Sequence, residues 1–369
     1  MEAAIAGTDG GDGGGSGDAT VGSLGEFGLI RAFAPRMPAG AYTSLGIGDD
    51  SAVVATPAGS VVVAVDMVLE GRHFVRSWSS GYDVGVKAAA RSLADIAAMG
   101  ATPTALLVAV ALPESLPAAW ALDLASGLAA EAERAGAGIV GGDTAAGESI
   151  HISVTALGDL AGRPPVRRSG AVPGDVVAVS GTLGHSAAGM ALLASGLGSG
   201  LTSGAGLDEL KSGLAPLIAT HLRPAPPYEA GLSAARAGAT AMIDVSDGLV
   251  ADLGHVAEAS GVRIDLSFGA LEPFLESPLT DAAAAVALAS APAGATGAVR
   301  SAVLGWVLTG GEDHSLAATF PASAVLPPEW RVIGEVRAPD ADAPGEVGAG
   351  QVTIDGRPYA SAGGWQHFR

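Results

Sequence analysis

Short apolar runs alternate along the first half of the chain with longer segments whose apolar residues recur at helical spacing. The Val- and Ala-rich runs predict strands over 51–56, 60–68, 104–112, 138–140 and 149–157. Helical spacing predicts helices over 24–33, 83–99 and 116–135. The tripeptide Pro57-Ala58-Gly59 separates the first two strand runs and predicts a hairpin turn between them.

The second half of the chain repeats this alternation. Apolar runs predict strands over 175–180, 241–243, 262–266 and 303–308. Helices are expected after Gly184, from the segment after Asp247 through Ala259, and over 281–289. Because strands and helices alternate in both halves, the fold class expected is α/β or α+β.

Two stretches predict how the chain divides into domains. Residues 1–22 are rich in glycine, bury almost nothing, and predict a flexible tail. The segment 162–165, Gly-Arg-Pro-Pro, combines two prolines with a charge and is the best candidate for a linker. We therefore expect an N-terminal domain over 23–161 and a C-terminal domain over 162–369, and 369 residues suffice for two buried cores.

Charge and cysteine content narrow the classes of function. A net charge of −19 argues against a nucleic-acid or anionic-membrane partner, since both require a basic surface. The chain has no cysteine, which excludes disulfides, thiolate zinc sites and a cysteine nucleophile. No signal pattern and no apolar run of membrane-spanning length is found. We expect a soluble, cytoplasmic protein.

Aspartates adjoin the predicted strands and helices at several separate places. Asp49 and Asp50 are neighbours on a glycine-hinged turn, and adjacent carboxylates repel each other unless a cation lies between them. Another, Asp95, follows Lys87 and Arg91 at helical spacing, on a face away from the main apolar stripe of the predicted helix 83–99. The full set is Asp49, Asp50, Asp66, Asp95, Asp143, Asp244 and Asp247.

These carboxylates suit Mg²⁺, which takes oxygen ligands and binds through carboxylates together with substrate phosphates. If they converge on one crevice, they can hold several ions between a nucleoside triphosphate and its acceptor, which is most of what phosphoryl transfer requires. The alternative is that each aspartate is a turn or helix-capping residue, such as Asp143 in the expected turn 141–143 or Asp247 before a helix.

If this protein binds ATP, metal ions and arginine must neutralise the phosphate charge. Lysine occurs only at positions 87 and 211, and neither lies in a Gly-x-x-x-x-Gly-Lys-Ser/Thr loop. Arg168 either binds a phosphate through bidentate hydrogen bonds from its guanidinium or is a solvated linker residue. Ser246, between two of the aspartates, either contacts phosphate or caps the following helix.

Three further residues are candidates for contact with the acceptor. The seven histidines show no zinc-binding spacing, but His73 lies in a polar turn after a predicted strand, where substrate loops often occur. Glu312 occupies a similar place after a double glycine. Trp365 near the C-terminus either stacks on a heterocycle or closes the core.

Taken together, these stretches resemble the thiamine-monophosphate kinase family, in the superfamily of aminoimidazole ribonucleotide synthetase and selenophosphate synthetase. The matching motifs occur in family order from about residue 23 to the C-terminus. They are Gly46-Ile47-Gly48-Asp49-Asp50, Asp66 with Gly71-Arg72-His73-Phe74, residues 92–100, Gly141-Gly142-Asp143-Thr144, Arg168-Ser169-Gly170, residues 244–249, Gly310-Gly311-Glu312-Asp313 and Gly364-Trp365-Gln366-His367-Phe368.

The resemblance implies ATP-dependent phosphorylation of thiamine monophosphate to thiamine diphosphate by direct in-line transfer, with no covalent catalytic nucleophile. It implies that the seven aspartates bind Mg²⁺. By the same resemblance, Gly142, Asp143, Arg168 and Ser246 contact ATP, and His73, Glu312 and Trp365 contact the substrate. It further implies a two-domain fold of the aminoimidazole ribonucleotide synthetase-like type, and a homodimer in which the N-terminal mixed sheets join in a barrel.

The chain departs from the family pattern at three places. Ala64-Val65 replaces a Ser-Thr pair, Ala145-Ala146 replaces Thr-Arg, and His314-Ser315 replaces Tyr-Glu. A sister enzyme of the superfamily acting on another phosphorylated metabolite is the nearest alternative, although the missing cysteine argues against the selenophosphate branch. A non-catalytic nucleotide or metal sensor on the same scaffold is the alternative from another class.

Overall fold

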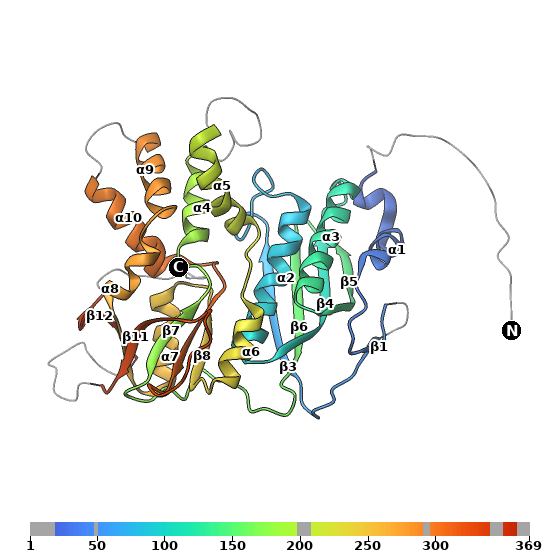
Figure 1. Ribbon diagram of the computed structural model, residues 1–369. Coiled ribbons are helices and arrows are strands. Elements are labelled where there is room, and N and C mark those ends of the chain that lie inside the picture. Colours follow the sequence, from blue (N-terminus) through green and yellow to red (C-terminus); the bar gives the residue numbers. More distant parts are fainter. Residues whose placement is uncertain (1–18, 48–50, 198–207, 291–295, 340–349, 360–369) are drawn as a thin grey trace, which may run out of the picture.

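The computed structural model describes residues 19–47, 51–197, 208–290, 296–339 and 350–359, and Figure 1 shows their two lobes. The predictions for Asp49, Asp50 and Trp365, and for most of the tail 1–22, lie outside the described residues.

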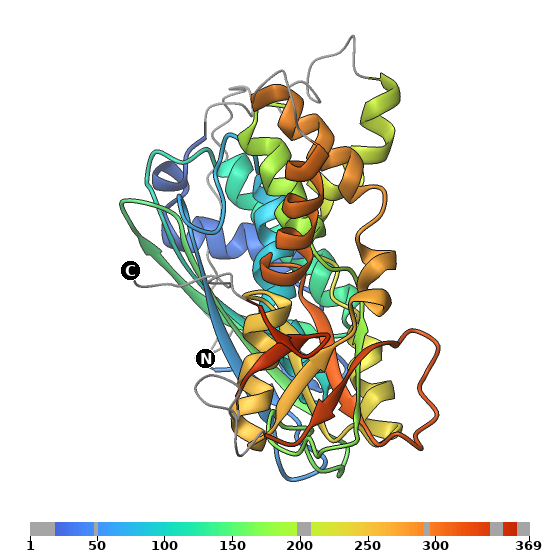
Figure 2. The ribbon, with the colours of Figure 1, turned by 90° about the vertical axis from the view of Figure 1, so that its left-hand side faces the viewer.

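The N-terminal lobe is a four-stranded mixed sheet with two helices against one face. Its strands lie in the order β3 (Val62–Leu69), β6 (His151–Asp159), β4 (Thr102–Leu112) and β5 (Gly138–Ala146), and only the β4–β5 pair is parallel. The helices are α2 (Gly81–Ala98) and α3 (Ala118–Arg134). In Figure 2 the strands form a layer along one edge of the molecule. Ahead of the sheet come α1 (Val21–Phe33), the 3-10 turn Ala34–Arg36, β1 (Thr43–Leu45) and β2 (Val53–Val54).

The C-terminal lobe is built on a seven-stranded sheet in the order β13-β12-β9-β11-β7-β10-β8. Its strands are β7 (Val176–Ser180), β8 (Ala241–Val245), β9 (Arg263–Leu266), β10 (Ser315–Phe320), β11 (Arg331–Arg337), β12 (Val352–Ile354) and β13 (Arg357–Pro358). Its helices are α4 (His185–Ala194), α5 (Asp208–Leu222), α6 (Tyr228–Arg236), α7 (Leu249–Ser260), α8 (Phe268–Leu271), α9 (Leu279–Ser290) and α10 (Thr296–Thr309), with a 3-10 turn at Glu272–Phe274. Figure 1 shows α4, α5, α9 and α10 grouped beyond one end of this sheet.

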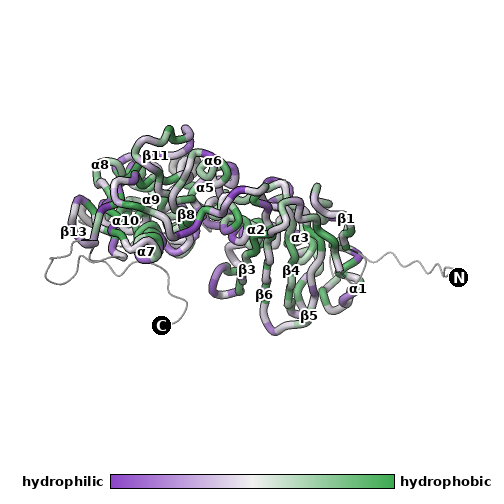
Figure 3. The backbone as a smooth tube through the Cα atoms, turned by 90° about the horizontal axis from the view of Figure 1, so that it is seen from below, coloured by the Kyte–Doolittle hydropathy of each residue, from purple (hydrophilic) through white to green (hydrophobic). Residues whose placement is uncertain are grey.

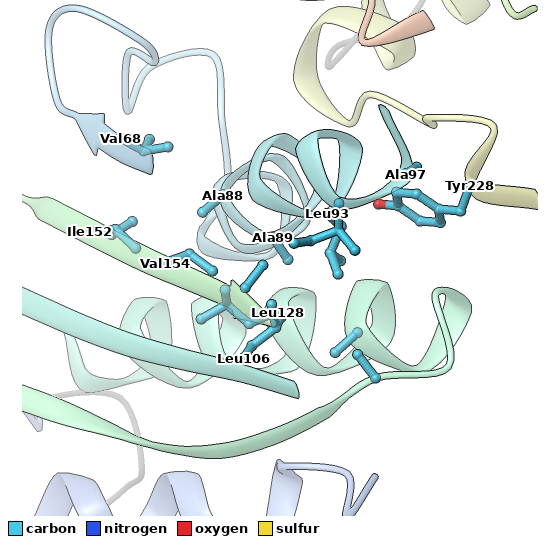
Figure 4. Close-up of a cluster of buried hydrophobic side chains, with 14 of the residues drawn as sticks. Val68, Ala88, Ala89, Leu93, Ala97, Leu106, Leu128, Ile152, Val154 and Tyr228 are labelled. Carbon is cyan, nitrogen blue, oxygen red and sulfur yellow. The ribbon is translucent and has the colours of Figure 1, made fainter. Parts of the chain in front are cut away.

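Helix α2 lies between the two lobes and is buried on most of its surface. Ser80 caps its first turn in a reciprocal capping box with Asp83. One face packs on the N-terminal sheet and α3, while another contacts α6 and β8 of the C-terminal lobe, as Figure 3 shows from below. In Figure 4, Ala89 and Leu93 lie in the cluster with Leu106 and Leu128. A helix packed on several sides needs apolar residues all round, not on one stripe.

Three sequence-based predictions are wrong, each because tertiary packing overrides a local signal. The runs 51–56 and 60–68 do not pair as a hairpin, since β2 pairs with β1 and β3 pairs along its whole length with β6. Residues 141–143 form no turn but continue β5, where a Cβ on Gly142 would lie 1.8 Å from the carbonyl oxygen of Val108. Residues 303–308 belong to helix α10, with Val303 and Val307 buried one turn apart.

Candidate active site

Three of the predicted acids converge where α2 meets both sheets. Asp66 comes from β3, Asp95 from the last turn of α2, and Asp244 from the end of β8. Asp66 and Asp95 are hydrogen-bonded to each other, and the Ser92 hydroxyl lies 3.0 Å from Oδ2 of Asp66. Lys87, Arg91 and Asp95 lie on one face of α2, and this face is turned toward the other acids.

Crowding of these carboxylates changes the ionisation of Asp95. Burial, and then the negative charges of Asp244 and Asp66, raise the pKa of Asp95 to about 8, while the Arg168 guanidinium opposes the rise. A bound cation would stabilise the ionised form of this carboxyl group, because it offsets the neighbouring negative charges. The donor set of Asp66, Asp95 and Asp244 therefore fits Mg²⁺.

The turn after β8 is organised by an acid that the sequence analysis missed. Oδ2 of Asp252 accepts hydrogen bonds, each 3.0 Å long, from the backbone N–H groups of Ser246, Asp247 and Gly248. Asp252 thus fixes the backbone of the turn between β8 and α7. Burial and the charges of Asp244 and Asp247 raise the pKa of Asp252 to about 8. An acid in the first turn of α7 was the available signal.

Glu312 links the C-terminal lobe to α2. Its Oε2 accepts a 2.7 Å hydrogen bond from Nζ of Lys87, and its Oε1 accepts one from Arg91. Burial alone would raise the pKa of this carboxyl group, but the charges of Lys87 and Arg91 hold it well below its usual range. Glu312 has a backbone φ of 67°, a left-handed conformation uncommon for a residue other than glycine.

A cavity of about 520 Å³ lies between the loop after β3 and helix α10. His73 and Glu312 both line it, so two of the predicted substrate contacts come from different lobes to the same space. Trp78, Met190 and Trp306 supply apolar walls, and none of the three was singled out from the sequence. Trp306 falls in the run misread as a strand; its large ring in that run was the only available signal.

The structure does not bring Asp143 to the three converging acids. Across the sheet, Asp143 on β5 lies opposite Ala109 on β4, which lies opposite Ser153 on β6. Ser153 in turn lies opposite Met67 on β3, one position after Asp66. Because successive strand residues point to opposite faces, Asp143 lies on the sheet face turned away from α2. Gly142 is paired with Val108, and Arg168 is exposed near Asp95.

The three family departures fall in different settings. Val65 is exposed on the outer face of β3, and Ala145 is exposed near the end of β5. His314 is buried, and its Nδ1 lies 3.2 Å from Oδ2 of Asp244. The preceding Asp313 accepts hydrogen bonds from the N–H groups of Gly184 and Ser186 at the start of α4, and burial raises the pKa of Asp313 to about 7.

The described residues hold no ready-made metal site and no candidate membrane span. Among them, no three His, Cys, Asp or Glu side chains are already arranged to hold an ion, although three acids converge. None of the described helices combines the length and apolar character needed to cross a bilayer.

Comparison with known proteins identifies this arrangement. Residues 48–160 match the family of AIR synthase related proteins, N-terminal domain, so the N-terminal lobe has the fold of that class. The chain is 45% identical to the thiamine-monophosphate kinase of Mycobacterium tuberculosis over 349 residues, 95% of this chain and 93% of that protein. The chain belongs to the thiamine-monophosphate kinase family.

Solved structures agree with this assignment. The crystal structure of thiamine-monophosphate kinase from Stenotrophomonas maltophilia K279a is similar with a TM-score of 0.69 and 31% identity, covering 89% of this chain and 95% of that one. A structure described as "AaThiL complexed with AMPPCP and TMP" is similar with a TM-score of 0.67 and 31% identity, covering 94% of this chain and 97% of that one. The mixed α/β fold expected from the sequence is confirmed.

Proposed function

We propose that this protein transfers the γ-phosphoryl group of ATP to thiamine monophosphate and so forms thiamine diphosphate. The observation that carries the proposal is the match over 95% of the chain to a thiamine-monophosphate kinase at 45% identity. The similar structure holding AMPPCP, a methylene analogue of ATP, together with TMP supports both substrates.

The geometry fits a direct transfer between two bound phosphates. The cavity walls at Trp78 and Trp306 suit the flat heterocycles of the acceptor, and Glu312 and His73 lie on the same cavity. Asp66, Asp95 and Asp244 would hold Mg²⁺, which supplies positive charge to the phosphate oxygens when bound. We propose that Asp49, Asp50 and Asp247 complete these metal ligands, whereas Asp143 lies on the other face of the N-terminal sheet.

The nucleotide is proposed to contact Gly142, Arg168 and Ser246. Arg168 already lies near enough to Asp95 to influence its ionisation, which fits a guanidinium at the edge of the metal and phosphate site. No side-chain nucleophile is required, because positioning and charge neutralisation supply most of the catalysis of phosphoryl transfer. Trp365 is retained as a proposed substrate contact.

We also propose that the protein works as a homodimer in the cytoplasm, where ATP is supplied. Three outward positions of β3 are apolar and exposed, with Val63 58%, Val65 63% and Met67 52% accessible. Leu107 on β4 adds to the same outer region. Exposed apolar patches of this kind mark interaction sites, and a second copy of the same sheet is the partner that the family implies. Asp143 faces the same side, so it would border that interface.

The test is an assay with ATP, Mg²⁺ and thiamine monophosphate in which thiamine diphosphate and ADP are separated and quantified. We expect the two products in equal amounts, with no product after Mg²⁺ is chelated. Asp66→Asn serves as the matched variant, because it removes one charge and keeps the shape of the side chain. If the wild-type protein binds ATP but forms no thiamine diphosphate, the proposal is wrong and another acceptor must be sought.

A further inference from the structure

We propose that Lys87 is a positioning residue for the acceptor, because its ammonium group ties together two walls of the acceptor cavity that come from different lobes. The inference rests on the proposed function and adds a residue that lies behind the cavity wall. Lys87 would fix the distance between the loop that carries His73 and the loop that carries Glu312.

The contacts of Lys87 cross the interface between the lobes. Nζ lies 2.7 Å from Oε2 of Glu312 in the C-terminal lobe and 3.3 Å from the carbonyl oxygen of His73 in the N-terminal lobe. Both partners line the cavity of about 520 Å³. The Lys87 side chain is only 2% exposed and is not part of the lining, so its action on a bound acceptor passes through its two partners.

Burial makes these two contacts obligatory. An ammonium group loses its hydration in the interior, so it must be compensated by a close negative charge and by further acceptors. Lys87 is a buried residue of α2, and Glu312 is its counter-charge. The carbonyl oxygen of His73 takes another of its three donors.

Arg91 does not duplicate this link. It lies one turn further along α2, where its guanidinium contacts Oε1 of Glu312 and its Nη2 lies 3.9 Å from Oδ1 of Asp66. Arg91 thus orients the carboxylate toward the metal side, whereas Lys87 joins it to the His73 loop. Loss of Lys87 should therefore disturb the acceptor walls more than the nucleotide contacts.

A third cavity residue responds to the same ammonium group. His221 lines the cavity and lies 3.1 Å, Nδ1 to Oγ, from Ser186. Burial and the positive charge of Lys87 lower the pKa of His221 to about 3, although Glu312 opposes this. The imidazole is therefore neutral at physiological pH, and it adds no second positive charge to this wall.

The test is a kinetic comparison of Lys87→Met with the wild type, varying each substrate in turn. We expect the KM for thiamine monophosphate to rise between about tenfold and a hundredfold, because a small misplacement of substrate-positioning groups has effects of that size. The KM for ATP should stay within about twofold, since the contacts of Lys87 with His73 and Glu312 lie at the acceptor cavity and not at Asp66, Asp95 or Asp244. Arg76→Met is the matched control. Arg76 belongs to the same loop as His73, but its guanidinium is more exposed and pairs with Glu70.

A double variant keeps the test decisive if Lys87→Met does not fold. Lys87→Met with Glu312→Gln removes both buried charges together, which proteins tolerate better than loss of one partner. Its KM for thiamine monophosphate should exceed that of Glu312→Gln alone by roughly tenfold, because the His73 loop has lost its anchor. Equal values, or a parallel rise in both KM values, would overturn the inference. A wild-type protein that forms no thiamine diphosphate would instead count against the proposed function.

Discussion

Nδ1 of His314 lies 3.2 Å from Oδ2 of Asp244, and both side chains are buried at the end of β8. His314 is one of the positions at which this chain departs from the family pattern. The acids that bind metal ions are usually held by a further hydrogen bond, which fixes their orientation. This pair therefore gives the departure a physical role: it holds one oxygen of a proposed Mg²⁺ ligand.

Replacing His314 should weaken the response to Mg²⁺. In His314→Leu, Asp244 loses this support, and we expect the Mg²⁺ concentration for half-maximal activity to rise roughly tenfold to a hundredfold. The measurement is a Mg²⁺ titration at saturating ATP, together with Mn²⁺ binding followed by electron paramagnetic resonance. His255→Leu, at an exposed position on α7, should leave both readouts unchanged. An unaltered Mg²⁺ requirement in folded His314→Leu would contradict this role.

Asp95 should make the metal-free protein less stable as the pH rises. Its folded-state pKa of about 8 exceeds the ordinary value of 3.8, so the folded state binds the extra proton between these limits. Stability therefore falls as the pH rises from about 4 to about 8, and Asp95→Asn removes this contribution. Thermal unfolding in a chelator at several pH values should show a flatter profile for Asp95→Asn. Mg²⁺ should restore stability at high pH in the wild type more than in the variant.

Trp306 is predicted to bind the acceptor. Removing its ring in Trp306→Ala should raise the KM for thiamine monophosphate by about tenfold or more, because an aromatic wall of the cavity is lost. The KM for ATP should change little, and Trp306→Phe should retain most of the affinity. Steady-state kinetics with each substrate varied in turn provides the check. If Trp306→Ala shows only a lower melting temperature, Trp306 belongs to the core of α10 alone.

The outer face of β3 is predicted to hold two copies of the chain together. Val65→Glu would place a charge at the centre of this apolar face, so we expect monomers in place of dimers. Sedimentation velocity at micromolar concentrations distinguishes the two. Val325→Glu makes the same substitution at a position that is 91% exposed in the C-terminal lobe, and it should leave the assembly unchanged. A wild-type protein that is already monomeric would refute the homodimer.

Much of the local structure was readable from the sequence, because periodicity and turn residues act over a few neighbours. The helix α2 and its row of Lys87, Arg91 and Asp95 follow from spacing alone. The strands β4, β6 and β7 were also anticipated close to their observed bounds. The strands β10 and β11 and the helix α6 were not, since short runs rich in alanine, or broken by charges, carry a weak periodic signal.

The candidate site was predictable as a set of residues but not as a geometry. The motifs named Asp66, Asp95 and Asp244, yet nothing local states that β3, α2 and β8 meet. Asp143 shows the limit most clearly, because the face that it occupies depends on strand register, and a shift of one residue reverses it.

The sequence by itself determined the kinds of chemistry available to this protein. Oxygen ligands, arginines, aromatic rings and the absence of thiols are properties of composition, and helix and turn signals depend on residues close in the chain. Tertiary structure alone decided which of these groups meet, as with Lys87 and Glu312, which are 225 residues apart. Such contacts depend on packing of whole elements, whose burial outweighs the weak local preference of any short segment.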